Sequence, residues 1–529
     1  MSAAAAVGGL AARQIRRGGL IVLGFAAAMP ALVAATYDTV AADPAAMAGL
    51  ETIATNPAVR TLFGEPVALD RAGGFTVWRV GTALAVVVGV WSVLATTRVT
   101  RGEEDAGRWD VLLAGRVPAR AVLARHLAVV ALVPVAVGAA VTAVLAAAGG
   151  PDRAGAAVHG AGLAVLGLFA VAVAALAAQI LPARAQATGA AIAVLGAGLL
   201  MRMVGDGLDG VAWLRWLSPF GLLARSAPYD RDDPVPLLIL LGAAVLTGAA
   251  ALAVAGRRDV GGGLVAPAGP RRPRPGLLGG VAPFAVRRAL PAVAAWSAGI
   301  VAYFLLIGLT VTSVAEFLAA NAAFTGTAAE AGFAGLDTTG GLTATLFAVL
   351  ALPVGAFTGV RLAAFTAAET DRRLATLAAG PLSRHRLLGA EVAATVGGAL
   401  VLLTAAAVAT WAGVAAAGGA LPLTAALAGT WNTLPIVLLS LGAAVLAVGA
   451  APRLTALAAA VPSTGGFLLQ VIADSTGAPG WVAAMSPFAH LAPVPLLPAN
   501  LPAAATTTAI AAALTLLGVL AYRRRDLAS

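Results

Sequence analysis

The chain contains no cysteine, which excludes disulfide bonds and thiolate metal ligands. Its four histidines are scattered without the spacing of a metal site. Lysine is also missing, so all 34 basic residues are arginine. Because a phosphate-cradling P-loop requires a lysine after its glycines, the chain cannot hydrolyse ATP through that motif. With no cluster of catalytic residues either, we expect no catalytic site, no metal and no cofactor in this chain.

Charge is scarce as well: only 11% of the residues are charged, 60% are hydrophobic and the mean hydropathy is +0.92. A helix needs about 20 apolar residues to cross a bilayer. Twelve such runs lie near residues 18–36, 80–97, 127–149, 160–181, 186–205, 235–256, 292–312, 341–360, 392–416, 423–448, 454–473 and 503–521. The sequence therefore predicts an all-α polytopic membrane protein of about twelve transmembrane helices.

The arginines predict an orientation. Placing both termini in the cytoplasm puts 26 of the 34 arginines on the inner side, in agreement with the positive-inside rule. The net charge of +10 then describes a surface that faces anionic lipid, rather than a nucleic-acid partner. A cleavable signal peptide is the alternative for Arg13, Arg16 and Arg17, but eleven later runs favour an uncleaved first helix.

The sequence repeats itself at about half its length. Glu104, Arg108 and Leu112 recur 265 residues later as Glu369, Arg373 and Leu377, Ser218-Pro219-Phe220 recurs as Ser486-Pro487-Phe488, and Arg257-Arg258-Asp259 recurs as Arg524-Arg525-Asp526. Six runs in each half make the repeat parallel rather than inverted. We expect a first six-helix half at 1–260, a Pro/Gly/Arg-rich cytoplasmic linker at 261–283 and a second six-helix half at 284–529.

The loops that follow the second and eighth runs are candidate docking elements. Glu104 and Arg108 stand four residues apart, which predicts a helical ion pair. An ordinary solvated helix would explain one such loop, whereas its recurrence favours a docking surface for a dimeric partner. The candidate docking residues are Glu103, Glu104, Arg108, Leu112, Glu369, Asp371, Arg373 and Leu377.

Aromatic segments precede the sixth and twelfth runs on the predicted outer side. They fit either a simple anchor at the lipid interface or a re-entrant element that closes the outer end of a pathway. The candidate residues of such an extracellular gate are Trp216, Ser218, Pro219, Phe220, Ser486, Pro487 and Phe488.

The runs themselves contain one charged residue, Arg202, and Glu391 is expected at the cytoplasmic edge of the ninth run as an interfacial charge. Ion-coupled carriers usually need a carboxylate at membrane depth. An ion-coupled secondary drug carrier is therefore the disfavoured alternative, and a membrane scaffold without transport activity is a further one. We expect any energy to come from a second polypeptide.

The duplicated loops resemble the coupling loops of type-two ABC export permeases. The resemblance rests on Glu104, Arg108 and Leu112 with Val117 to Arg120, and on Glu369 and Arg373 with Pro381 and Arg384. The whole architecture is similar to the actinobacterial twelve-helix permeases of the polyketide antibiotic exporter and multidrug efflux class. Glu103 and Gly107 are replaced by Ala368 and Arg372 in the second loop, so the two docking sites differ.

This resemblance implies a permease of the bacterial inner membrane that exports amphiphilic small molecules such as antibiotics or drugs. Two copies of a separate ABC ATPase would bind ATP and magnesium and dock on the coupling helices. The second, fifth, eighth and eleventh helices would line the substrate pathway. Candidate lining residues on those helices are Trp91, Met201, Met203, Phe347, Phe357, Phe467 and Gln470.

Overall fold

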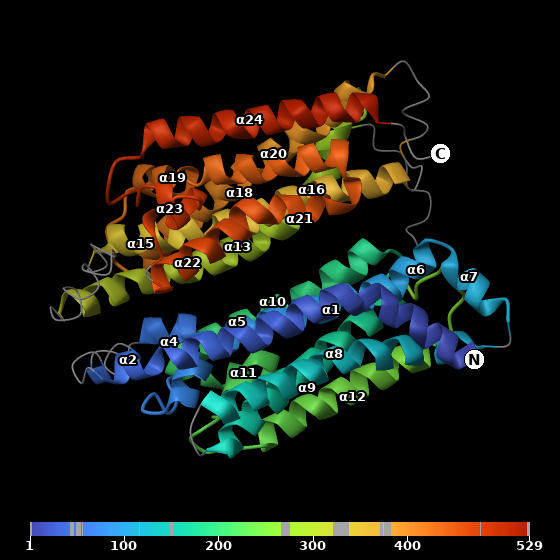
Figure 1. The fold of residues 1–529 in the computed structure, drawn as a ribbon, viewed down its shortest axis with the longest axis horizontal. Coiled ribbons are helices and arrows are strands. Elements are labelled where there is room, and N and C mark those ends of the chain that lie inside the picture. The colour runs from blue at the N-terminus through green and yellow to red at the C-terminus, as the bar shows by residue number, and fades with distance from the viewer. Residues whose placement is uncertain are drawn as a thin grey trace. The chain divides into compact units, whose positions relative to one another are not determined.

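The computed structural model describes residues 3–42, 47–48, 54, 57–115, 117–148, 152–265, 276–320, 338–370, 374, 382–476 and 478–525. Every regular element within these residues is a helix (Figure 1), which confirms the predicted all-α polytopic fold. The chain divides into two compact units, Met1–Arg271 and Arg272–Ser529.

Unit 1 begins with the long helix that contains Arg13, Arg16 and Arg17. Its elements are α1 (Ala3–Ala35), α2 (Tyr37–Ala41), α4 (Pro57–Phe63), α5 (Ala72–Val99), α6 (Arg101–Asp105), α7 (Arg108–Leu113), α8 (Ala119–Ala148), α9 (Arg153–Ile180), α10 (Arg184–Gly207), the 3₁₀-helix η1 (Asp209–Leu217), α11 (Pro219–Arg225) and α12 (Val235–Ala255).

Unit 2 is built in the same order. Its helices α13 and α18 are longer than the corresponding α1 and α8 of unit 1, and most of its other long helices are divided into more pieces. Its elements are α13 (Val281–Ala319), α15 (Thr339–Val349), α16 (Ala351–Thr370), α18 (Arg384–Ala416), α19 (Leu423–Trp431), α20 (Leu434–Ala450), η2 (Pro452–Leu454), α21 (Thr455–Ala460), η3 (Val461–Gly465), α22 (Gly466–Thr476), α23 (Gly480–Ala483), η4 (Pro487–His490) and α24 (Leu501–Arg524).

Twelve helices in the described residues are long and apolar enough to cross a membrane, and each overlaps one of the predicted runs. Six lie in unit 1: Val7–Ala35, Ala72–Asp105, Ala119–Ala148, Arg153–Ile180, Arg184–Gly207 and Val235–Ala255. Six lie in unit 2: Val281–Ala319, Thr339–Thr370, Arg384–Ala416, Leu423–Ala450, Pro452–Ala473 and Leu501–Arg524. We refer to them as spans one to twelve.

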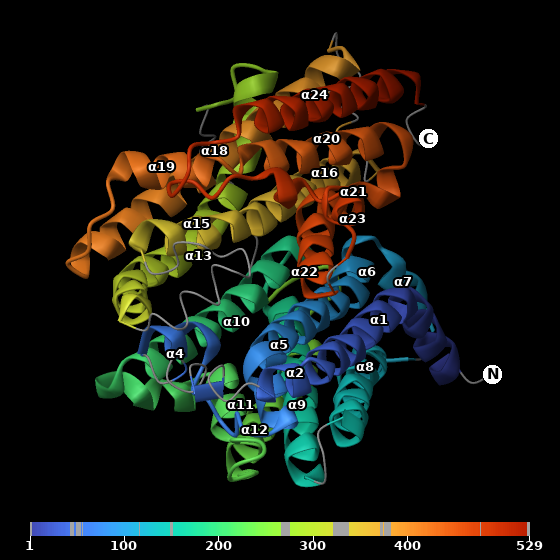
Figure 2. The same ribbon diagram turned by 60° about the vertical axis from the view of Figure 1, so that its left-hand side comes forward.

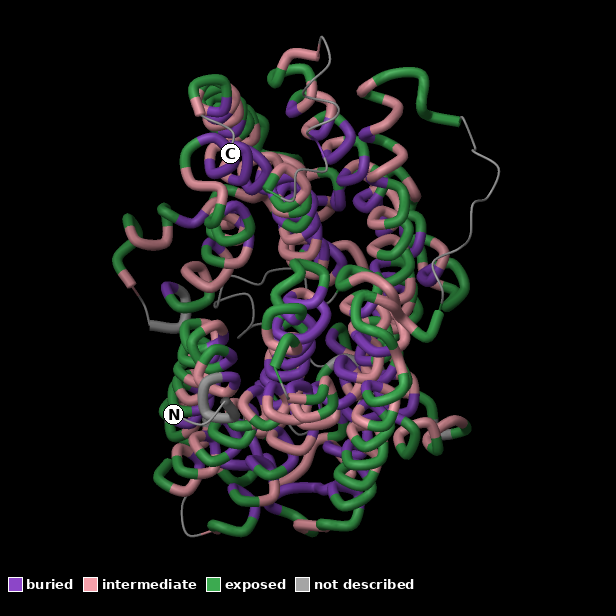
Figure 3. Tube along the Cα trace, turned by 90° about the vertical axis from the view of Figure 1, so that its right-hand side faces the viewer, coloured by how far each residue is buried: buried purple, intermediate pink, exposed green. Residues whose placement is uncertain are grey.

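Small residues bring the spans of each unit close together. A Cβ atom on Gly138 of α8 would lie 2.4 Å from the carbonyl oxygen of Gly160 on α9, and one on Gly308 of α13 would lie 2.3 Å from that of Thr410 on α18. Such close approach lets backbones pack where lipid provides no hydrophobic drive for association. The buried residues follow the inner faces of the helices (Figure 3).

The eleventh span is not a continuous α-helix. Five residues, Val461–Gly465, form a π-helical turn between α21 and α22. Pro462 lies in this turn and has no backbone N–H to donate, so it weakens the regular hydrogen-bond ladder there. The helix resumes at Gly466 as α22, which is labelled in Figure 2. Gly466 is the point at which Pro487 of the following segment approaches this helix.

The two ends of each unit are named by what they carry. The termini end of unit 1 holds the start of α1, the α6–α7 elbow and the residues that follow α12, and that of unit 2 holds the end of α16 and the end of α24 (Figure 1). The opposite, loop end of unit 1 holds α2, α4, η1 and α11, and that of unit 2 holds α23 and η4.

Candidate functional site

The α6–α7 elbow of unit 1 is made of two short helices at the termini end. Gly107 stands between them with a φ of 70°, a left-handed conformation that glycine adopts at little cost. This turn breaks the single helix that the sequence predicted. The predicted pair of Glu104 with Arg108 is therefore wrong: Arg108 donates to Glu103 instead, with distances of 2.6 Å from Nε and 2.5 Å from Nη2.

Glu104 forms a buried clamp with a distant arginine. Its Oε1 and Oε2 each accept a 2.6 Å hydrogen bond from the Arg258 guanidinium, and Arg101 Nη1 lies 3.0 Å from Oε2. The Gly261 N–H adds a further bond of 2.7 Å. The three side chains are at most 6% exposed. We call this group the Glu104 clamp; because it is enclosed, Glu104 has no surface to offer a partner.

The Glu104 clamp joins three segments of unit 1. Arg101 donates to the carbonyl oxygens of Leu181 and Gly262 at 2.8 Å each, and Arg258 Nε donates to Gln179 Oε1 at 2.8 Å. The elbow is thereby fixed to the end of α9 and to the chain that leaves α12.

Unit 2 contains the equivalent clamp at its own termini end. Glu369, at the end of α16, accepts a hydrogen bond from Arg525, just after α24, and Arg525 Nη1 donates to the Val448 carbonyl at 2.6 Å. This Glu369 clamp is less enclosed, with side chains 10% and 20% exposed. The residues paired by sequence repeat, Glu104 with Glu369 and Arg258 with Arg525, thus make the same contact. Three predicted docking residues, Asp371, Arg373 and Leu377, lie outside the described residues.

The elbow exposes a different set of side chains from the one predicted. Trp109 is buried against His126, with ring centroids 5.9 Å apart, and Leu112 packs against the same buried cluster. Val111 faces outward and is 78% exposed, the highest value among the exposed large hydrophobic side chains. Arg108 is 60% exposed at its side chain. The accessible face of α7 therefore consists of Arg108, Asp110 and Val111.

At the loop end, the Ser-Pro-Phe segment of unit 1 is fastened to the fifth span. Ser218 Oγ donates a 2.6 Å hydrogen bond to the Gly198 carbonyl and accepts one of 2.9 Å from the Gly221 N–H. Gly198 leaves room for Pro219, whose Cδ would be 2.7 Å from an added Cβ. Ser218, Pro219 and Phe220 are all buried, whereas Trp216 is 41% exposed.

Unit 2 repeats the contact of this segment with a glycine of the eleventh span, although Ser486 Oγ accepts from the Phe488 N–H, two residues on, rather than three. Ser486 Oγ donates to the Gly466 carbonyl at 2.9 Å, and Pro487 Cδ would lie 2.7 Å from a Cβ on Gly466. Phe488 contacts Phe467 edge-on, with ring centroids 5.6 Å apart. These segments are packing anchors for the fifth and eleventh spans, and a gating role for them stays a prediction.

The predicted pathway residues lie in several environments. Met203, Phe347 and Phe357 are buried among helices of their own unit: Phe347 stacks on Phe304 and Phe357 meets Trp296 edge-on. Trp91, Phe467 and Gln470 are half-buried, and Met201 is 36% exposed. Contact with a substrate remains a prediction for all seven.

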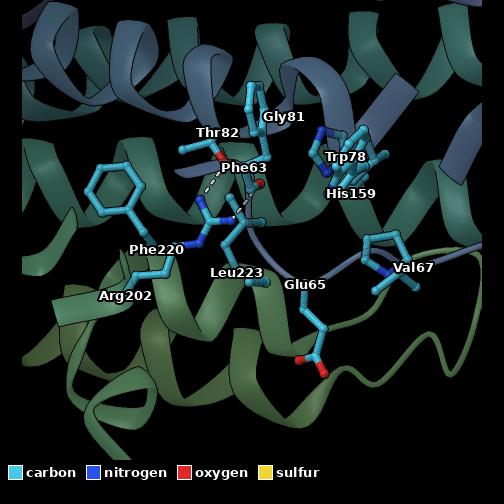
Figure 4. Close-up of a pocket in the computed structure, with 13 residues that line it drawn as sticks. Phe63, Glu65, Val67, Trp78, Gly81, Thr82, His159, Arg202, Phe220 and Leu223 are labelled. Atoms are coloured by element: carbon cyan, nitrogen blue, oxygen red, sulfur yellow. Dashed lines mark hydrogen bonds between the residues drawn. The ribbon is translucent and has the colours of Figure 1, made fainter. Parts of the chain in front are cut away.

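An ion network around Arg202 was not predicted. Arg202 Nε donates to Asp206 at 2.9 Å, Nη2 donates to the Phe63 carbonyl at 3.0 Å, and Nη1 donates to Thr82 (Figure 4). Asp206 lies one residue beyond the predicted fifth run, which is why Arg202 was the one charged residue of the predicted runs. The segment that follows Phe63 crosses a cavity of about 50 Å³ lined by Trp78, His159 and Leu223 among others.

Known proteins match this chain over nearly its full length. Residues 5–255 and 278–523 match the family described as multidrug efflux system permease Rv1217c, C-terminal domain. The multidrug efflux system permease protein Rv1217c of Mycobacterium tuberculosis (strain ATCC 25618 / H37Rv) is 31% identical over 513 residues, which span 93% of this chain and 89% of the relative.

The chain belongs to the multidrug efflux system permease family. This membership confirms the predicted resemblance to the multidrug efflux permease class. It also confirms a multi-pass membrane protein of the transporter class.

This multidrug efflux permease family member carries one more buried charge group, at the termini end of unit 2. Glu391 of α18 accepts a hydrogen bond from Arg361 of α16, and its other carboxylate oxygen lies 3.5 Å from Arg288 Nη1. Glu391 is 2% exposed. Glu391 lies in the first turns of α18, which begins at Arg384, and its expected position at the cytoplasmic edge of the ninth run stays a prediction.

Proposed function

We propose that the chain is the transmembrane subunit of an ATP-driven exporter of amphiphilic small molecules, energised by two copies of a separate ABC ATPase that bind ATP and magnesium. Family membership supports the efflux role. The observation that supports the ATPase coupling is the pair of clamps, which fix the α6–α7 elbow of unit 1 and the end of α16 in unit 2 to the residues that follow the last span of each unit. A push on the elbow would then move the sixth span as well as the second.

The docking surface in this proposal is the outer face of α7. A large exposed apolar side chain on a span has lipid to cover it, whereas Val111 lies on α7, beyond the second span. An apolar residue flanked by Arg108 and Asp110 is the composition expected at the centre of a protein interface with a polar rim. Both termini face the cytoplasm in this arrangement, where an ATPase has access to ATP.

Co-purification tests the docking role. The full chain is co-expressed with the candidate ATPase in a membrane host, and the Val111→Glu variant is expected to lose most of the bound ATPase, because a buried unpaired charge is costly at an interface. Val265→Glu is the matched control: Val265 is 51% exposed beyond the sixth span of the same unit. Equal retention of the ATPase by both variants and wild type would remove α7 from the docking surface.

One observation favours a second candidate, an ion-coupled drug carrier. Glu391 is a buried carboxylate in a span, and such groups are costly and therefore often functional. Both of its carboxylate oxygens already pair with arginines of unit 2, Arg361 and Arg288, which disfavours this second candidate. Efflux that collapses with an uncoupler while the ATP level is held constant would favour the carrier.

A further inference from the structure

The loop end of unit 1 is rich in charged side chains of both signs. Eight arginines lie there: Arg60, Arg71, Arg79, Arg153, Arg202, Arg215, Arg225 and Arg231. Unit 2 has no arginine in the stretches 289–360, 387–452 and 454–522, which include its whole loop end. A feature present in only one unit serves something other than the fold that both units share.

Part of this charge surrounds a cavity of about 300 Å³. Three arginines and three carboxylates line it: Arg215, Arg225, Arg231, Glu65, Asp206 and Asp230. The lining is mainly polar, and the cavity lies between the segment that follows α4 and the chain around α11. It is large enough for a small polar group with its hydration water.

The carboxylates of this cavity all form ion pairs with arginines. Glu65 Oε2 lies 2.7 Å from Arg215, and Asp206 is 2.9 Å from Arg202 and 3.6 Å from Arg215. Asp230 lies 3.5 Å from Arg231. Each negative charge therefore has an arginine beside it, and no carboxylate is left to hold a cation.

Arg225 is the uncommitted charge. It has no hydrogen bond or ion pair with the described residues, and its guanidinium lies over the Trp216 ring at 4.0 Å from the centroid. Burial lowers the pKa of Arg225, the positive charges of Arg215 and Arg231 lower it further, and the nearby carboxylates Glu65 and Asp233 raise it. Arg225 is therefore the cation of this cavity that has no ion pair with the described residues, and its buried Nε has no hydrogen-bond partner, so its guanidinium is available to an anion.

An apolar space adjoins the cavity. The smaller cavity of Figure 4 shares Glu65, Val67 and Ala224 with it, and its walls include Phe63, Trp78, Phe220 and Leu223. Exposed Trp213 and Leu217 of η1 lie on the neighbouring surface. Aromatic side chains of this kind sit at the level of lipid head groups.

We propose that the loop end of unit 1 binds an amphiphile with a phosphate or carboxylate head group, which sits on Arg225 between Arg215 and Arg231 while its apolar part lies against Phe63 and its neighbours. A guanidinium can bind either oxyanion with two parallel hydrogen bonds. The ligand is a membrane phospholipid or a soluble anion that enters from the aqueous side, and the two share this chemistry. The site does not depend on an ATPase.

Native mass spectrometry of the full chain in a neutral detergent tests this site, with lysophosphatidylglycerol as probe and zwitterionic lysophosphatidylcholine for comparison. We expect wild type to prefer the anionic probe and Arg225→Gln to weaken its binding about tenfold. Arg153→Gln removes the same charge from an exposed position at the same end and is expected to change binding less than twofold. Arg225→Lys should restore part of the affinity.

Competition identifies the source of the ligand. If inorganic phosphate at millimolar concentration displaces the probe, the head group alone is sufficient and a soluble anion fits the site; if it does not, the apolar part is needed and the ligand is a lipid. Equal binding of the two lysolipids by wild type, or equal weakening by Arg225→Gln and Arg153→Gln, would overturn the proposal. Unchanged thermal unfolding of each variant shows that the fold is intact.

Discussion

The two units agree at their termini ends and differ at their loop ends. Glu104 with Arg258 and Glu369 with Arg525 form the same clamp at corresponding places, although the second is more exposed. At the loop end the Ser-Pro-Phe anchors also match, but the arginine-lined cavity exists in unit 1 alone among the described residues. Contacts that hold the shared fold recur, whereas the feature that recognises a ligand occurs once. The contacts common to both units therefore maintain the fold, and the cavity found in unit 1 is a candidate for ligand recognition.

The largest effect is expected at the Glu104 clamp. Glu104→Ala leaves Arg101 and Arg258 buried without a counter-charge, which should lower the free energy of unfolding by about 3–5 kcal/mol. Glu369→Ala should cost less, because water reaches Arg525. Denaturant titration of the purified variants in mixed micelles measures both.

Glu103→Ala is the control for this experiment, since its partner Arg108 is largely exposed. It should cost under about 1 kcal/mol. Equal losses for Glu103 and Glu104 would show that the clamp is not a buried structural element.

Next in size is Gly64→Ala, which affects unit 1 only. A Cβ on Gly64 would lie 1.7 Å from Arg202 Nη2, and its φ of 96° is unfavourable for alanine. We expect the segment after α4 to detach from Arg202, with a cost of about 1–3 kcal/mol. Faster hydrogen exchange of residues 63–67, with no change in unit 2, would be the sign. Unchanged exchange there would mean that Arg202 does not hold the segment.

A smaller and symmetric effect is expected at the two anchors. Ser218→Ala and Ser486→Ala each remove a buried hydrogen bond to a glycine carbonyl, at a cost of about 1–2 kcal/mol. The geometry predicts similar losses of thermal stability in both variants. If one variant lost stability and the other did not, the two loop-end anchors would not be equivalent.

The smallest effect is expected for Glu65→Gln. Glu65 is 49% exposed and pairs with Arg215 and Arg60, so its loss should cost less than about 1 kcal/mol. It frees Arg215, however, and should strengthen binding of the anionic lysolipid. Weaker binding in this variant would contradict the charge balance of the cavity.

The membrane spans were the feature that the sequence predicted best. Bilayer thickness fixes the length of an apolar run, so all twelve spans were predicted. Their interruptions were not: the π-helical turn in the eleventh span depends on how Pro462 is accommodated by neighbouring backbone.

Side-chain partners were harder to predict because they depend on distance in space. The i,i+4 rule paired Glu104 with Arg108, but Gly107 breaks the helix and Arg258, 154 residues away, takes the carboxylate. A usable signal existed, since the glutamate and the closing Arg-Arg-Asp both recur in register. The Arg202 network was missed because the predicted run ended one residue before Asp206.

The central claim is that energy comes from a second polypeptide that docks beside the two clamps, at the α6–α7 elbow of unit 1 and after α16 of unit 2. Transport in proteoliposomes tests this claim most directly. Vesicles that contain the chain with its ATPase should accumulate a fluorescent amphiphile on adding ATP, with no loss when an uncoupler is present, and vesicles with the chain alone should show none. Equal accumulation by the chain alone, driven by a proton gradient and abolished by Glu391→Gln, would contradict the account.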